Sequence, residues 1–291
     1  MRSAISLMAG VLLAWPLLAA GGANRNNPAK GVNFWSIERE IVLGKQLAAE
    51  LERQVKLLDD PIVDEYVNRV AQNIARQSDI PIPVTVRVID SSELNAFTLP
   101  GGHVYVANGM LKLTESEAEM AFVLAHELGH VAARHATRQA TRQEILQIGS
   151  IPLAILGGWG GLALREGAAV GSQLGYLKGA RVFESQADLL GLQFMEKSGY
   201  DPTAAVDFFE RIEAAERKVP NAVARLYETH PLPASRIAET QKRINEVLGA
   251  KAEYVITTSE YERLRQRIVK IEENRAAAPT QSPSLIKARP N

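Results

Sequence analysis

The apolar positions along the chain predict several helices and one short group of strands. Between Ser36 and Leu58 apolar residues recur at helical spacing, which predicts a long amphipathic helix. A second helix is predicted to follow Asp59-Asp60-Pro61, because proline is favoured in the first helical turn. The residues expected to form its buried stripe are Ile62, Tyr66, Val70 and Ile74.

Three short segments then have the character of strands. Residues Val84 to Ile89 are rich in β-branched side chains, and the runs 95–99 and 103–106 flank a turn at Pro100-Gly101-Gly102. Asn108-Gly109 is expected to close the last run. The fold class predicted from this order is mainly α with a small β-sheet (α+β).

A further helix is predicted over Glu115 to Thr137, started by a capping box between Thr114 and Glu117. Its buried face would carry Met120, Leu124, Leu128 and Val131. Within it lies His126-Glu127-Leu128-Gly129-His130. Residues four apart share a helix face, so both imidazoles can bind one small cation. Glu127 can reach a water on the open side of the metal and act as its base. The alternative is two ordinary surface histidines.

The region after this helix contains a candidate third ligand. A helix is predicted from Arg181 to Ser198, ended by Gly199, and its apolar stripe turns Glu184 and Asp188 onto one neighbouring face. Glu184 can complete a His-His-Glu set. Asp188 can accept a hydrogen bond from the ring N–H of a ligating histidine and fix its tautomer. The alternative is a pair of exposed acids.

The remaining periodicity predicts smaller elements. Helices are expected at 203–216, closed by Val219-Pro220, and from the Arg236 region to Leu248, with a short strand at 254–257 and a helix at 260–274.

No charged residue occurs between Glu144 and Arg165, and the stretch 145–164 is long enough to cross a bilayer. A single crossing would separate His126 and His130 from any later ligand. We therefore interpret residues 145–177 as a helical hairpin or lid beside the site, with peripheral membrane contact as the alternative.

Composition narrows the class of protein. The 33 basic and 33 acidic residues balance, so charge gives no reason to expect nucleic-acid binding. Arg2, an apolar run from Ala4 to Ala20 and small residues up to Ala23 have the order of a secretory signal. An uncleaved membrane anchor is the alternative. The chain contains 0 cysteines, which excludes disulfides. An exported, periplasmic protein is expected.

Taken together, these motifs resemble peptidase family M48, and in particular its soluble periplasmic, BepA-like branch. The resemblance covers roughly residues 37–248. It rests on Asn95-Ala96-Phe97 with Pro100-Gly101-Gly102, on the two ligand motifs, and on Thr229-His230-Pro231-Leu232-Pro233 with Arg236. Only residues 249–291 follow, so docking through C-terminal helical repeats is not carried over.

The resemblance implies a gluzincin-like metallopeptidase domain with an edge strand beside the metal helix and one zinc per chain. His126, His130 and Glu184 would be the ligands, Glu127 the base and Asp188 the support of a ligand. His230 and Arg236 would approach the metal, to stabilise the oxyanion or, for His230, to occupy the fourth zinc position in a self-inhibited form. The expected division is a signal peptide at 1–23, a linker at 24–35, the metallopeptidase domain at 36–248, a strand and helix extension at 249–275 and a disordered tail at 276–291.

An edge strand can hold an extended peptide by main-chain hydrogen bonds. The residues expected to hold the polypeptide substrate in this way are Gly102, His103, Val104, Tyr105, Val106 and Ala107, although His103 can also be a solvated strand residue. The expected function is hydrolysis of misfolded or unassembled envelope proteins. The alternatives are a non-catalytic or self-inhibited zinc protein that acts as a chaperone or adaptor, and a membrane-embedded prenyl-protein protease, which the lack of convincing spans disfavours. Oligomeric state is left open.

Overall fold

The computed structural model describes residues 28–144, 181–218, 223, 226, 230, 235–247 and 253–277. The predicted lid at 145–177, the predicted signal at 1–23 and nearly all of the predicted tail at 276–291 lie outside these residues. The labelled elements are α1 (Ile37–Gln54), α2 (Pro61–Arg76), β1 (Thr85–Ile89), β2 (Ala96–Leu99), the short helix η1 (Pro100–Gly102), β3 (His103–Ala107), α3 (Asn108–Leu113), α4 (Glu117–Ala132), α7 (Ala204–Lys218), α9 (Arg236–Val247) and α10 (Ser259–Ala277). Residues 135–144 and 181–198 are also helical. Within this described part, no helix has the length and apolar character that a membrane span needs.

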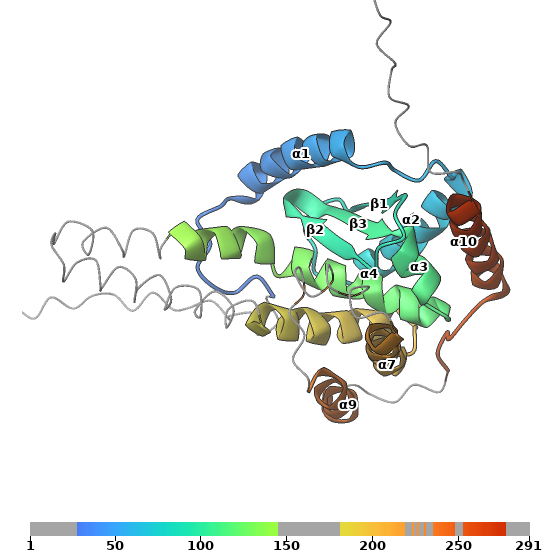
Figure 1. Cartoon of the computed structure of the whole chain (residues 1–291). Coiled ribbons are helices and arrows are strands. Elements are labelled where there is room, and N and C mark those ends of the chain that lie inside the picture. The colour runs from blue at the N-terminus through green and yellow to red at the C-terminus, as the bar shows by residue number, and fades with distance from the viewer. Residues whose placement is uncertain are drawn as a thin grey trace, which may run out of the picture.

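The small sheet lies between α1 on one face and α4 on the other, which confirms the α+β prediction (Figure 1). The alternating pattern of the strands explains this layering. Tyr105 packs beneath α1 in a small apolar cluster with Ala48 and Ile89. The side chains of the opposite face, such as Val104 and Val106, join the main core with α2 and α4.

The strand order is β1-β3-β2, with β1 parallel and β2 antiparallel to β3. Both edges of β3 are therefore occupied, and the prediction that a substrate pairs with residues 103–107 is wrong, whereas Gly102 belongs to η1. The strand at the edge next to α4 is β2. The turn between β2 and β3 needs glycine, because Gly101 and Gly102 have φ angles of 77° and 86°.

The beginnings of two helices differ from the sequence expectation. Ser116 caps α4 by accepting a hydrogen bond from the Glu119 backbone N–H, whereas Thr114 donates to the Leu111 carbonyl at the end of α3. The predicted capping box is therefore wrong. The strand run ends at Ala107, directly before Asn108-Gly109 as predicted, and Asn108 then begins α3. In α2 the predicted stripe residues Tyr66, Val70 and Ile74 are buried, but Ile62 is exposed and its neighbour Val63 is buried instead.

Helix α4 forms the centre of the core. All of its residues from Glu117 to Ala132 are buried except His130, which is partly buried, and this excludes the reading of His126 and His130 as exposed surface histidines. The predicted single helix to Thr137 is interrupted after Ala132. Arg134 has a φ angle of 54°, a left-handed conformation that few residues other than glycine adopt. Its side chain is held by an ion pair with buried Glu40 of α1 at 2.7 Å.

Residues 181–198 pack directly across α4, helped by two glycines. A Cβ atom on Gly129 would lie 2.8 Å from the carbonyl oxygen of Ala187, and one on Gly191 would lie 3.2 Å from the backbone nitrogen of His126. The two backbones therefore approach much closer than ordinary side chains allow. This close contact brings Glu184 next to the two histidines of α4.

Replacing Gly129 with alanine tests this contact. Because the new methyl group would meet backbone atoms, the helix at 181–198 must shift, and overpacking of this kind costs about 1–3 kcal/mol. We expect chemical denaturation of Gly129→Ala to show a loss of that size, together with weaker metal binding. In the matched control Gly199→Ala, a left-handed φ of 86° adds strain but no clash within 4 Å. It should lose about 1–2 kcal/mol of stability and keep its metal affinity. Equal metal affinity in both variants would contradict the proposed role of the contact.

Candidate metal centre

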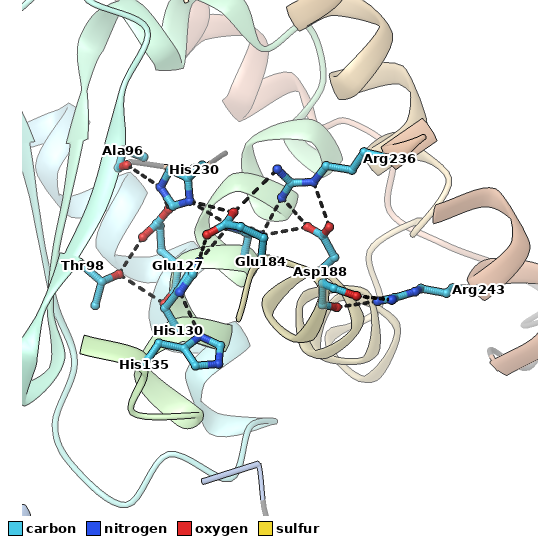
Figure 2. Close-up of polar contacts among 12 residues, drawn as sticks. Ala96, Thr98, Glu127, His130, His135, Glu184, Asp188, His230, Arg236 and Arg243 are labelled. Atoms are coloured by element: carbon cyan, nitrogen blue, oxygen red, sulfur yellow. Dashed lines mark hydrogen bonds and ion pairs between the residues drawn. The ribbon is translucent and has the colours of Figure 1, made fainter. Parts of the chain in front are cut away.

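Four side chains from three parts of the chain meet beside α4. His126, His130, Glu184 and His230 each offer one ligand atom, and these atoms all lie within 4.8 Å of one another. His126 and His130 come from α4, Glu184 from the helix at 181–198, and His230 from the segment before α9. Figure 2 shows Glu184 and His230 pointing toward each other above His130. The spacing predicted from sequence is therefore realised, and His230 joins the predicted set.

The separations between these atoms fit a small metal ion. His126 Nε2 lies 3.1 Å from His130 Nε2 and 3.4 Å from Glu184 Oε2, and it lies 3.3 Å from His230 Nδ1. Ligands at zinc–nitrogen and zinc–oxygen distances around a tetrahedral ion are roughly 3.3–3.4 Å apart. The chemistry also fits, since imidazole nitrogens and a carboxylate are ordinary zinc ligands.

Charge favours a cation at the same place. The pKa of Glu184 lies well below its usual range: burial raises it, but the neighbouring His230 and His130 outweigh that effect. Burial also raises the pKa of Asp188, while Arg236 and His126 hold it below the ordinary value. Both carboxylates are therefore ionised at neutral pH within a buried site.

Asp188 lies behind the ligands, as its position one turn after Glu184 predicts. Its Oδ1 atom is 3.0 Å from His126 Nδ1, the ring nitrogen opposite the ligand atom. Arg236, the first residue of α9, donates from Nε to Asp188 Oδ2 at 2.8 Å and from Nη2 to Oδ1. Its guanidinium also lies over the Phe209 ring at 4.5 Å. Its Nη1 atom lies 3.7 Å from Glu184 Oε2, so Arg236 approaches the candidate centre as expected, and its shorter contacts support a role in holding Asp188.

Glu127 is oriented by the edge strand. The Thr98 hydroxyl of β2 donates to Glu127 Oε2 at 2.7 Å, a contact that Figure 2 shows on the strand side of the site. Glu127 Oε1 lies 3.3 Å from His230 Nε2. The carboxylate is thus fixed through one oxygen, and its second oxygen faces the histidine. Thr98 was not singled out from the sequence, because nothing in the local pattern shows which strand residue faces α4.

His230 reaches both the ligand cluster and the edge strand. Its Nε2 atom lies 3.1 Å from the Ala96 carbonyl oxygen, and its Nδ1 atom lies 3.0 Å from Glu184 Oε2. A carbonyl can only accept, so Nε2 carries a hydrogen. Nδ1 faces the ionised Glu184 carboxylate and lies among the candidate ligand atoms. It can donate to that carboxylate in the absence of a metal, or give its lone pair to a bound metal ion.

A cleft runs along β2 past the centre, and an apolar cavity adjoins it. The cleft is lined by Thr98, Leu99, Gly102, Glu127, His130 and Phe183, among other residues. His103 to Ala107 do not line it. The adjoining cavity is mostly aromatic and aliphatic, with Phe122, Phe208, Phe209 and Leu226 in its wall next to His126 and His230.

His135 also contacts the centre, and sequence reasoning missed it. Its Nδ1 atom lies 2.9 Å from His130 Nδ1, and burial lowers its pKa to about 4. Five residues of continuous helix would place His135 on another face from His130. The left-handed turn at Arg134 redirects the chain, and no local signal in the sequence predicts that turn.

Comparison with known proteins agrees with this geometry. A model of peptidase family M48 matches residues 61–244, which is more than half of the chain and contains all the residues of the centre. The beta-barrel assembly-enhancing protease of Yersinia pestis is 27% identical over 259 residues, covering 83% of this chain and 53% of that protein.

Two further relatives extend the comparison. The protein of the same name from Escherichia coli strain K12 is 29% identical over 220 residues, covering 73% of this chain and 45% of the relative. The mitochondrial metalloendopeptidase OMA1 of Schizosaccharomyces pombe is 33% identical over 186 residues, covering 62% of this chain and 53% of that protein. The chain thus spans about half the length of the curated relatives that it matches. On the family match and the arrangement of the centre, the chain belongs to peptidase family M48.

Proposed function

We propose that this protein is a zinc-dependent endopeptidase that hydrolyses unfolded or unassembled polypeptides of the cell envelope, with one zinc held by His126, His130 and Glu184. The observation that carries the proposal is the convergence of these ligand atoms within tetrahedral spacing beside Glu127. The membership of family M48 and the names of the relatives support the same activity.

The chemistry that a bound zinc supplies is Lewis acidity, which lowers the pKa of a water toward neutrality and balances negative charge on the carbonyl oxygen. Glu127 takes the proton of the attacking water and later delivers it to the leaving nitrogen. Thr98 holds Oε2 of this carboxylate, so Oε1 is the atom that accepts the proton. Asp188, held by Arg236, keeps the hydrogen of His126 on Nδ1 and leaves Nε2 for the metal.

In this proposal the substrate strand lies along the outer edge of β2, with which no other strand of the described residues pairs. The Ala107 N–H donates to the Asn95 carbonyl, so Asn95 and Phe97 face β3, and the alternate residues Ala96 and Thr98 direct their backbone groups toward the cleft. Main-chain pairing with these groups does not depend on side-chain identity. The adjoining apolar cavity favours substrates with a large apolar residue beside the scissile bond, which unfolded proteins expose.

His230 closes this site in the arrangement described here. Its ring uses the Ala96 carbonyl that a substrate would need, faces Glu127 Oε1, and directs Nδ1 at the metal position. These three contacts favour the self-inhibited form over the reading in which His230 stabilises the oxyanion. A substrate can pair with Ala96 only when the His230 ring leaves this carbonyl.

The location and partners follow the same proposal. An exported, periplasmic protein is consistent with the signal-like N-terminus and with relatives named for beta-barrel assembly. The rival proposal is a zinc protein that acts as a chaperone or adaptor, and the closed position of His230 is the observation that favours it. A protein with intact envelope function after Glu127→Gln would select that rival.

Removing the metal should destabilise the fold. Without a cation, the ionised Glu184 and the clustered imidazoles face each other in a buried site, whereas bound zinc stabilises only the folded state. A free zinc concentration 1,000 times Kd would add about 4 kcal/mol. We expect calorimetry to show a lower Tm after treatment with a chelator and recovery after addition of zinc. Identical Tm values under the two conditions would argue against a metal at this position.

Glu127→Gln should bind zinc normally and fail to cleave unfolded casein. The amide keeps the hydrogen bond from Thr98 but cannot accept the proton of water, and loss of a general base costs about 10²–10⁴-fold in rate. The measurement pairs metal content with casein hydrolysis. Glu65→Gln, on an exposed part of α2, is the matched control and should remain active. Full activity in Glu127→Gln would remove Glu127 from the role of base.

His230→Ala should cleave casein faster than the wild type. Removing the ring frees Glu127 Oε1 and the Ala96 carbonyl. For each 1.4 kcal/mol by which His230 stabilises the closed form over the open form, the rate should rise about tenfold. Initial rates at saturating zinc, compared at equal metal content, measure the effect. A slower variant that still binds zinc would instead assign His230 to stabilisation of the oxyanion.

A further inference from the structure

A chain of hydrogen bonds leads from the back of His130 to the N-terminal segment. His130 Nδ1 lies 2.9 Å from His135 Nδ1. On the other side of its ring, His135 Nε2 lies 3.1 Å from Gln186 Oε1. Gln186 Nε2 then donates to the carbonyl oxygen of buried Pro28 at 2.8 Å. Gln186 belongs to the same helical turn as Glu184 but has no part in the chemistry described above.

The direction of every bond in this chain is fixed by its far end. A proline carbonyl only accepts, so the amide nitrogen of Gln186 must face Pro28 and its oxygen must face His135. Arg138, which only donates, supports this orientation from Nη1 at 3.3 Å to the same oxygen. His135 therefore carries its hydrogen on Nε2 and has a lone pair on Nδ1. His130 must donate from Nδ1, which leaves its Nε2 lone pair among the ligand atoms.

The position of His135 is itself strongly restrained. Its ring stacks on Phe183, with centroids 4.4 Å apart and planes 24° apart. The left-handed residue Arg134 turns the chain back toward His130, and its ion pair with Glu40 and its hydrogen bond to the Trp35 carbonyl hold that turn. Figure 2 shows the ring of His135 beside that of His130, on the side away from Glu184.

We propose that His135 and Gln186 are positioning residues for the proposed metal ligand His130. Because the Pro28 carbonyl can only accept, the chain of hydrogen bonds that begins there keeps the hydrogen of His130 on Nδ1 and its lone pair on Nε2. This inference rests on the proposed zinc site. It assigns to His130 the kind of support that Asp188 gives to His126, but with neutral groups instead of a carboxylate. It also makes the described N-terminal segment part of the metal site, although residues 24–35 were expected to form only a linker.

The test compares zinc affinity, measured by competition with a chromophoric chelator, across a set of full-length variants. His135→Phe keeps the stacking on Phe183 but removes the acceptor, and Gln186→Leu removes the next member of the chain. Each should lose about 10–100-fold in affinity, the usual effect of losing such a partner. His135→Asn keeps an acceptor near the position of Nδ1 and should recover part of the loss.

His103→Phe is the matched control, because His103 is the half-buried first residue of β3 and does not line the cleft. It should bind zinc as tightly as the wild type. Wild-type affinity in both His135→Phe and Gln186→Leu would overturn the inference while leaving the zinc site intact. If the wild type itself binds no zinc, the proposed function fails, and this inference fails with it.

A second measurement uses only the wild type and so does not depend on a variant that folds. Long-range ¹H–¹⁵N spectra of the zinc-loaded protein report which ring nitrogen of each histidine carries hydrogen. We expect hydrogen on Nδ1 of His130 and on Nε2 of His135. Hydrogen on Nδ1 of His135 would reverse the chain and overturn the proposal.

Discussion

The backbone contact between α4 and the helix at 181–198 is the constraint on which the candidate metal centre depends. Gly129 and Gly191 let the two helices approach so closely that an added Cβ would lie 2.8 Å and 3.2 Å from backbone atoms. Two ligands on one helix and one on the other then lie within tetrahedral spacing. Because close-packed interiors transmit small displacements, a small change at this contact alters the ligand distances directly.

Each proposed ligand on α4 has a different kind of group behind its ring. Asp188, itself held by Arg236, contacts His126 Nδ1, whereas neutral His135 contacts His130 Nδ1. A second carboxylate behind His130 would add another buried charge, and buried charges without partners are costly. A neutral chain that ends on a backbone carbonyl fixes the tautomer without that cost.

A substrate strand and the His230 ring would compete for the same groups of the edge strand β2. Thr98 of β2 orients Glu127, and the Ala96 carbonyl of the same strand accepts from His230. A substrate strand and the His230 ring therefore exclude each other at Ala96. In the proposed function, this competition couples the binding of a substrate to the opening of the site.

Local periodicity was sufficient to predict the ligand-bearing helices, because residues four apart on a helix lie on one face wherever the helix is placed. That spacing puts His126 with His130, and Glu184 with Asp188, on common faces, whereas the choice of Glu184 over an ordinary exposed acid also needed the resemblance to the family. Strand order and the turn at Arg134 depend on partners far away in the chain, such as Glu40, so the sequence misassigned the edge strand and missed His135. Neighbouring residues such as Thr114 and Ser116 can each cap the same helix, so the sequence places a helix start only to within one or two residues, and in the structure Ser116 caps α4. The sequence therefore determined which side chains can bind a metal, and only the tertiary structure decided what surrounds them, because pairing and close packing join residues that no local pattern connects.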